Sequence, residues 1–96
     1  MNKEQIILKL KQIKPVLSEK YGLTEIALFG SYSRDEETPS SDIDLLIAFR
    51  KPSASSLFAS FDLLQECFGT IPVQIVTKGA IKPRYFEAIK QDLIYA

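Results

Sequence analysis

Two aspartates, Asp42 and Asp44, stand at the start of one of the most apolar runs in the chain, residues 43–49. Alternate side chains of a strand leave the same face, which places the two Cα atoms about 6.6 Å apart and both carboxylates in one patch. Without a cation, their repulsion and partial desolvation would raise the pKa of at least one carboxyl group. Magnesium takes oxygen ligands and keeps open positions for water and phosphates. The pair therefore predicts a metal site suited to phosphate chemistry.

A glycine and a serine, Gly30 and Ser31, follow the preceding apolar segment "EIALF". Gly30 has no side chain to block a close approach, and the amides of the next turn, together with the Ser31 hydroxyl, could bind phosphate oxygens. Arg34 could also contact phosphate. The other interpretation of Arg34 is a local ion pair with one of the acidic residues 35–37. If both strands end at one edge, the metal and phosphate sites face each other.

The aspartate pair has two other interpretations, a structural one and a calcium-binding one. A D-x-D pattern is common by chance, and either acid could cap a strand or lie in solvent. Asp42 and Asp44 also match the first two ligand positions of an EF-hand calcium loop. Leu46 and Ile47 then occupy the positions of a third oxygen ligand and an obligatory glycine, which excludes that loop.

Composition limits the class of protein. The 96 residues, 46% hydrophobic and 25% charged, suffice for one domain spanning residues 1–96. Twelve basic and twelve acidic residues balance, so the charge gives no support for nucleic-acid binding. A single cysteine, Cys67, and no histidine exclude an internal disulfide and argue against a zinc site. No apolar run reaches the roughly 18 residues of a membrane span, so we expect a cytoplasmic protein with no membrane partner.

Hydrophobic spacing and turn residues predict the elements that would position these side chains. Pro15 should kink or split the first helix near Lys14, and Gly22 should end it. Ser53 or Ser55 is expected to cap the middle helix. The expected elements are a helix over the first twenty residues, a strand over 25–30, a polar loop over 31–41 with one helical turn, a central strand over 42–49, a helix ending at Gly69, a strand over 71–77 and a helix over 82–96 with Tyr85, Ile89 and Leu93 facing inward.

This order, α-β-α(turn)-β-α-β-α, predicts an α/β (α+β) fold with a small mixed sheet and helices packed on it. The pattern shows no repeat and no linker. Because the last predicted helix reaches Ala96, we expect the surface that carries an acceptor to belong to another protein.

The segments "LFGSYSR" and "SDIDLLI" together resemble the signature of the minimal nucleotidyltransferases of the DNA polymerase beta-like superfamily, and the resemblance covers the whole chain. It implies a nucleotidyltransferase-like fold and a magnesium-dependent (or manganese-dependent) transfer of a nucleoside monophosphate from ATP or another nucleoside triphosphate to an acceptor. In that case Gly30, Ser31 and Arg34 bind the nucleotide, while Asp42 and Asp44 are the metal ligands and catalytic residues.

Two positions depart from the family pattern. Asp35 stands where the family often has glycine. Gln74, in "VQIV", stands where the family usually has a third carboxylate in a context such as "VDLV". A glutamine offers a neutral oxygen but adds no charge and accepts no proton as a base would. The other interpretation of Gln74 is a polar residue on the exposed face of an edge strand.

The resemblance extends to stand-alone members that serve as antitoxins and transfer AMP to an all-helical HEPN partner protein. We therefore expect AMP transfer to such a partner. The alternative hypothesis is a protein that has kept the fold, has lost the chemistry through Gln74, and acts by occupying the surface of a partner protein. Gln74 favours this alternative, whereas the intact Gly30-Ser31 and Asp42-x-Asp44 pairs favour the enzyme.

Overall fold

A four-stranded mixed sheet forms the centre of the computed structural model, which describes residues 1–96. The strand order is β3-β2-β1-β4; β1 is antiparallel to β2 and β4, and β2 is parallel to β3. The elements in chain order are α1 (Lys3–Tyr21), β1 (Leu23–Phe29), β2 (Ile43–Phe49), α2 (Ala54–Phe68), β3 (Val73–Thr77), α3 (Pro83–Ile89), the 3-10 helix η1 (Lys90–Asp92) and β4 (Ile94–Tyr95). The expected mixed α/β fold and the central place of β2 are confirmed.

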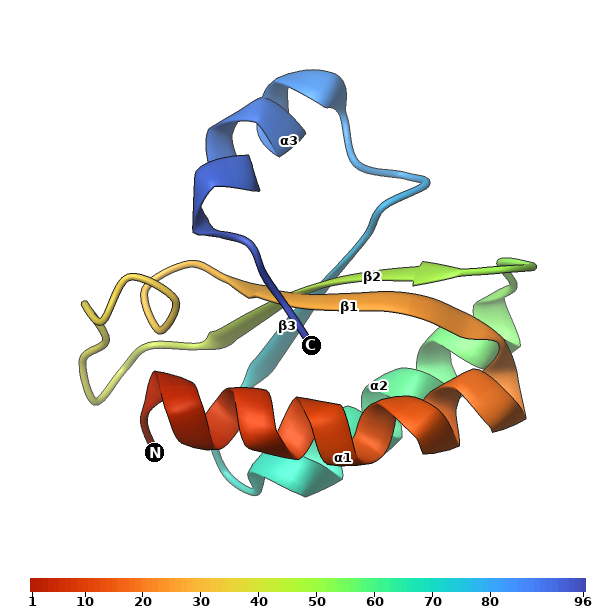
Figure 1. Ribbon diagram of the computed structural model, residues 1–96, viewed down its shortest axis with the longest axis horizontal. Coiled ribbons are helices and arrows are strands. Elements are labelled where there is room, and N and C mark those ends of the chain that lie inside the picture. Colours follow the sequence, from red (N-terminus) through yellow and green to blue (C-terminus); the bar gives the residue numbers. More distant parts are fainter.

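Helices cover both faces of this sheet (Figure 1). α1 and α2 lie together on one face, drawn below the sheet, and α3 lies on the other. Each strand contributes side chains to both layers, because consecutive strand side chains point to opposite faces. In β2, Ile43, Leu45 and Ile47 belong to the core under α1 and α2, whereas Leu46 belongs to the smaller cluster under α3.

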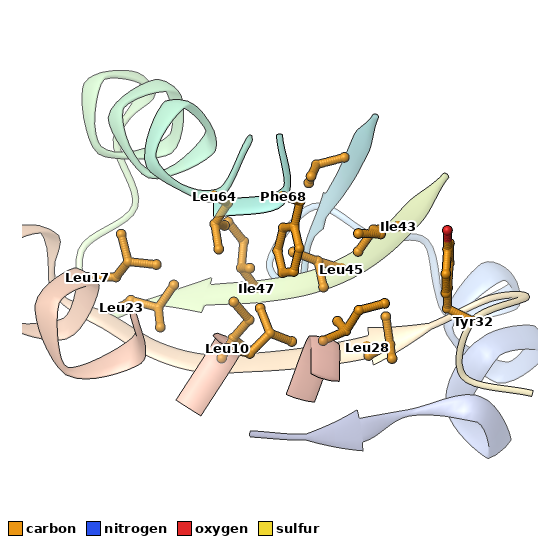
Figure 2. Packing of buried hydrophobic residues seen from close by; sticks show 13 residues of the cluster. Leu10, Leu17, Leu23, Leu28, Tyr32, Ile43, Leu45, Ile47, Leu64 and Phe68 are labelled. Carbon is orange, nitrogen blue, oxygen red and sulfur yellow. The ribbon is translucent and has the colours of Figure 1, made fainter. Parts of the chain in front are cut away.

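The larger core lies between the sheet and the pair α1 and α2, as Figure 2 shows for its buried side chains. Its members share almost complete burial. They include Ile6, Leu10 and Leu17 of α1, Leu28 of β1, Leu45 and Ile47 of β2, and Leu64 and Phe68 of α2. Both helices therefore pack one apolar face against the same side of the sheet.

Helix boundaries follow the predicted signals, with one exception. Gly22 ends α1 in the left-handed conformation (φ 72°), and the Ser53 hydroxyl caps α2 by accepting the amide of Ser56 at 3.1 Å. Of the kink or split predicted at Pro15, the split is wrong, because α1 continues through this residue. Pro15 is exposed, so water can satisfy the carbonyl group that loses its amide partner.

The end of the chain differs from the prediction. α3 stops at Ile89, and after η1 the chain forms β4, which pairs with β1 through Ala27 and Tyr95. Tyr85 is exposed, not buried; Ile89 is buried and Leu93 packs against the same cluster. Without β4, β1 would be an edge strand with unpaired backbone groups. The hydrogen bonds that β4 makes to β1 outweigh the tendency of residues 85–93, given by their helical spacing, to continue as one helix.

The loop between β1 and β2 contains one hydrogen-bonded turn that includes the i to i+4 bond of a helical turn, as predicted. The Gly30 carbonyl accepts the Arg34 amide at 3.3 Å, and the Ser31 carbonyl accepts the Glu36 amide at 2.9 Å.

None of the helices combines the length and apolar character that crossing a bilayer requires.

Candidate functional site

Three side chains from neighbouring strands stand in one row on the α3 face of the sheet. Asp44 of β2 pairs in register with Phe29 of β1 on one side and with Gln74 of β3 on the other. Asp42 precedes β2 and shares the alternation of Asp44, so both acids face away from the α1 and α2 core. Gln74 Nε2 donates a hydrogen bond to Asp42 Oδ2 at 3.4 Å. The structure thus brings together three of the residues that the sequence singled out.

The Gly30 turn touches this row directly. Gly30 has a φ of 81°, and a Cβ at this position would lie 2.1 Å from Asp44 Oδ2. Only glycine fits both the backbone conformation and the space. The half-buried Ser31 follows on the same turn. The predicted juxtaposition of the glycine turn and the aspartate pair is therefore present in the structure.

The electrostatics of the pair show unbalanced negative charge. Burial, and after it the charge of Asp42, raises the pKa of the Asp44 carboxyl, while Arg34 acts in the opposite direction. Neither Asp42 nor Asp44 takes part in any of the ion pairs of the structure. Two oxygen-rich side chains without a cationic partner fit a divalent cation, which would relieve both the desolvation and the repulsion.

A third acidic ligand is missing from this patch. No group of three acidic, histidine or cysteine side chains is placed to hold a metal ion. Gln74 occupies the neighbouring position on β3, and its amide points an N–H group at Asp42. Gln74 is also exposed on an edge strand, which confirms that part of the structural interpretation, whereas its identity as a vacant third-carboxylate position stays a prediction. Asp42 and Asp44 are the residues that could hold magnesium, with Gln74 able to offer only a neutral oxygen.

Arg34 lies on the other side of the glycine turn and is held by two carboxylates. Its Nη1 lies 2.7 Å from Asp92 Oδ2, and its Nε lies 3.1 Å from Glu36 Oε1. The predicted local ion pair with residues 35–37 is confirmed for Glu36. Asp92, 58 residues away, had no signal in the sequence. Its carbonyl also accepts a hydrogen bond from the Ser33 hydroxyl, so η1 is attached to the turn at two points.

Asp35 has a positive φ of 58°, which gives a physical reason for the glycine that the family often has there. Aspartate is among the few residues that tolerate this conformation. Lys3 of α1 adds an ion pair with it at 3.0 Å. Asp35 thus adopts in this turn a backbone conformation that glycine also adopts readily.

A hollow of about 450 Å³ lies away from the carboxylates, between the end of β2 and the start of α2. It is lined by Phe49, Ser53 and Leu57 among others and includes none of the predicted site residues. A second hollow of about 500 Å³ runs between α2 and β3 and does include Gln74. The row of Asp44 and Gln74 is therefore bordered by open space on the β3 side.

Known proteins match this chain along most of its length. The family model described as "Nucleotidyltransferase domain" matches residues 10–96. A candidate protein adenylyltransferase of Methanocaldococcus jannaschii, MJ0128, is 46% identical over 88 residues, which cover 90% of this chain and 89% of that protein.

Two solved structures share the fold. A candidate minimal nucleotidyltransferase superposes with a TM-score of 0.81 at 25% identity, covering 98% of this chain and 95% of that chain. A chain from the complex of the tri-AMPylated HEPN toxin of Shewanella oneidensis with its MNT antitoxin gives a TM-score of 0.64 at 18% identity, covering 97% and 70%.

Proposed function

Because this chain belongs to the nucleotidyltransferase domain family, we propose that it transfers AMP from ATP to a hydroxyl group of a partner protein, with magnesium bound by Asp42 and Asp44. The observation that carries the proposal is the contact between the Gly30 turn and Asp44. It brings a turn whose amides are free to bind phosphate, in this proposal, next to a pair of unneutralised carboxylates. The name of the relative in M. jannaschii supports protein as the acceptor.

Each residue of the site has a distinct task in this reaction. The amides that follow Gly30 and the Ser31 hydroxyl bind phosphate oxygens, and Arg34 adds N–H groups that its two carboxylate partners leave free. When bound, magnesium would neutralise charge on the triphosphate and on the departing pyrophosphate. The acceptor oxygen forms a bond to the α-phosphorus, the bond from that phosphorus to pyrophosphate breaks, and the hydroxyl loses its proton. Gln74 cannot take this proton, which leaves Asp42 and Asp44 as the nearest bases.

The partner in this proposal is a HEPN-type helical protein. The solved complex of an AMPylated HEPN toxin with an MNT antitoxin contains a chain of the same fold as this one. The toxin in that complex is AMPylated, which is the modification that the proposed reaction would produce.

A second candidate function has one specific observation in its favour. The patch lacks a third carboxylate, and at the neighbouring position the neutral Gln74 amide donates a 3.4 Å hydrogen bond to Asp42. A protein with this site could bind its partner without transferring AMP. The two functions differ in whether the partner becomes labelled.

The test uses the full chain, a purified HEPN-type protein and ATP labelled at either the α- or the γ-phosphate. AMP transfer labels the partner from α-labelled ATP only, requires magnesium or manganese, and is lost in Asp42→Asn and Asp44→Asn. Asp62→Asn is the matched control, because Asp62 is an exposed acid on α2, away from the row. Equal labelling by all four proteins would refute the role of the pair, and tight partner binding without any label would favour the second function.

A further inference from the structure

The outer edge of β3 offers backbone groups that no other strand of this chain uses. β3 is the last strand of the sheet on that side. The Ile43 amide donates to the Pro72 carbonyl and the Lys78 amide donates to the Ile47 carbonyl, both at the β2 side. Backbone groups alternate sides along a strand, so the even-numbered residues of β3 bond to β2 and the odd-numbered ones face outward.

Part of this edge is closed by the protein itself. The Val73 amide donates to Gln65 Oε1 at 2.9 Å, and the Thr77 carbonyl accepts amides from the turn that follows. The groups that remain are the Val73 carbonyl, both groups of Ile75 and the Thr77 amide. Residues 73–77 include no charge and no proline that would discourage another strand. The free edge is therefore short, centred on Ile75, and unprotected.

An apolar groove borders the same edge. The hollow of about 500 Å³ between α2 and β3 is lined by Leu57, Phe58 and Phe61 on the helix and by Val73 and Ile75 on the strand, among others. Phe58 is 65% exposed, the largest exposed fraction among the large apolar residues of the chain. A strand added to β3 would place every second side chain in this groove.

The other side chains of an added strand would face the candidate site. The row Phe29, Asp44, Gln74 crosses three strands on the α3 face, and an added strand supplies its fourth position. That residue would stand one strand spacing, about 4.8 Å, from Gln74, and Gln74 itself reaches Asp42. An acceptor residue bound there would point at the carboxylates, while both its chain neighbours would enter the apolar groove.

A second copy of this chain does not meet the chemical requirement of that position. In a two-fold symmetric, antiparallel pair, two β3 strands share their edges by pairing odd-numbered residues with each other, since those carry the outward groups. Gln74 would then face an even-numbered residue of the other copy, and Pro72, Gln74, Val76 and Lys78 have no hydroxyl group. The occupant that fits both the groove and the chemistry is a segment of another protein.

We propose that β3 is the docking strand for the acceptor: an extended segment of the partner protein adds to its free edge, with a hydroxyl-bearing residue opposite Gln74 and apolar residues on either side of it in the groove. The docking mode is β-strand addition, in which backbone hydrogen bonds give affinity and alternate side-chain positions give specificity. This inference rests on the proposed function for the role of the hydroxyl group, whereas the docking itself can be measured without any transfer.

The probe is the peptide KVQVYVQVK, whose valines alternate with polar residues around a central tyrosine, the hydroxyl side chain that reaches furthest. The matched peptide KVQYVVQVK has the same composition, but a shift of one position sends its tyrosine to the groove side. Each is titrated into the full chain while backbone amide resonances are recorded. Shifts are expected for the outward amides of Ile75 and Thr77, with much smaller shifts for Val76, whose amide bonds to β2.

Two exposed apolar residues provide matched variants. Phe58→Ser should weaken peptide binding about tenfold, as expected for truncation of an interface anchor. Leu8→Ser should leave binding unchanged, because Leu8 is 58% exposed but lies on α1. Peptide shifts confined to another surface, no binding at all, or equal weakening in both variants would overturn the docking strand. The docking proposal would also be overturned if the parent binds no peptide but self-associates, and if Phe58→Ser abolishes this self-association. A second copy of the chain would then be the occupant of the groove.

The register is tested with α-labelled ATP and magnesium. The first peptide should become labelled and the second should not; equal labelling of two peptides that both shift Ile75 would overturn the position opposite Gln74. If the peptide binds β3 and nucleotide binding at Asp42 and Asp44 is absent, the docking strand stands and the proposed function fails. The two failures are therefore distinguishable.

Discussion

Substitution of Gly30 by alanine tests the contact on which the proposed function depends. The added Cβ would lie 2.1 Å from Asp44 Oδ2, so the carboxylate must retreat to at least 3.0 Å. Asp44 would move by nearly an ångström away from the turn that is proposed to bind the phosphates. The change is the smallest one that separates the two halves of the site.

The expected loss of stability has two parts. Alanine in the left-handed conformation costs about 1–2 kcal/mol, of which about 0.4–1 kcal/mol is offset because alanine restricts the unfolded chain more than glycine does. Forcing the Asp44 side chain some 30° from its preferred rotamer adds about 0.5–1.5 kcal/mol. We expect the free energy of unfolding to fall by about 2 kcal/mol in total.

Gly22→Ala is the matched control. Gly22 also has a positive φ (72°), but a Cβ there would meet only Arg50 Cβ, at 3.9 Å, an ordinary contact. This variant should lose about 1 kcal/mol from its backbone alone and keep its activity. The difference between the two variants isolates the displacement of Asp44.

The assays are urea unfolding and AMP transfer from α-labelled ATP. Misplacement of a reacting group by about 1 Å can reduce the rate by on the order of a hundredfold, and Gly30→Ala should approach that loss while remaining folded. Magnesium-dependent nucleotide binding should weaken in parallel. If Gly30→Ala loses no more stability than Gly22→Ala and retains its transfer rate, the reasoning from the Gly30 and Asp44 contact is wrong.

Three further predictions concern charge in and around the site. Burial and the Asp42 charge raise the pKa of the Asp44 carboxyl in the folded protein. Without metal, the free energy of unfolding of the parent should therefore fall as the pH rises from about 4 through this raised pKa. Asp44→Asn should remove that fall. Urea unfolding in EDTA at pH 3 to 8 measures this, and equal pH profiles for parent and variant would contradict it. Asp92→Asn should cost less than about 1 kcal/mol and tighten nucleotide binding at low salt, since it removes a negative charge from Arg34; weaker binding would contradict this. Gln74→Asp should raise the transfer rate, by about a hundredfold or more if the new carboxylate acts as a base. If the parent already transfers AMP rapidly and the variant is no faster, Gln74 is not a vacant carboxylate position.

Local patterns predicted the parts of the fold that local forces decide. The apolar run of β2 predicted a strand buried on both faces, and Gly22 and Ser53 predicted the ends of two helices, because each signal depends on neighbouring residues only. Pro15 misled for the same reason, since its exposure on α1 is a property of the tertiary structure. β4 had no local signal strong enough to compete with helical spacing, because its stability comes from pairing with β1.

In the candidate site, too, local spacing predicted some features and the tertiary structure decides the others. Spacing alone put Asp42 and Asp44 on one face, and the structure places Gly30 beside them. The pairing of Arg34 with Asp92 spans 58 residues and depends on where η1 packs, which no spacing rule reports. The outward groups of β3 follow from its edge position, which only the strand order reveals.

The alternation of β2 has a consequence for how the protein can misfold. A slip of one residue would move Ile43, Leu45 and Ile47, all 0% exposed, out of the larger core onto the α3 face and drive Asp42 and Asp44 under α1 and α2. Removing three such side chains from that core forfeits up to about 1.5–3 kcal/mol each, comparable in sum to the whole stability of a small domain, before the cost of burying two charges. Misregistered molecules are therefore too unstable to accumulate as folded but inactive species. In a preparation of this protein, the fraction of molecules that are folded should equal the fraction whose carboxylates are correctly placed, so that titration of the metal-dependent nucleotide site counts folded molecules directly.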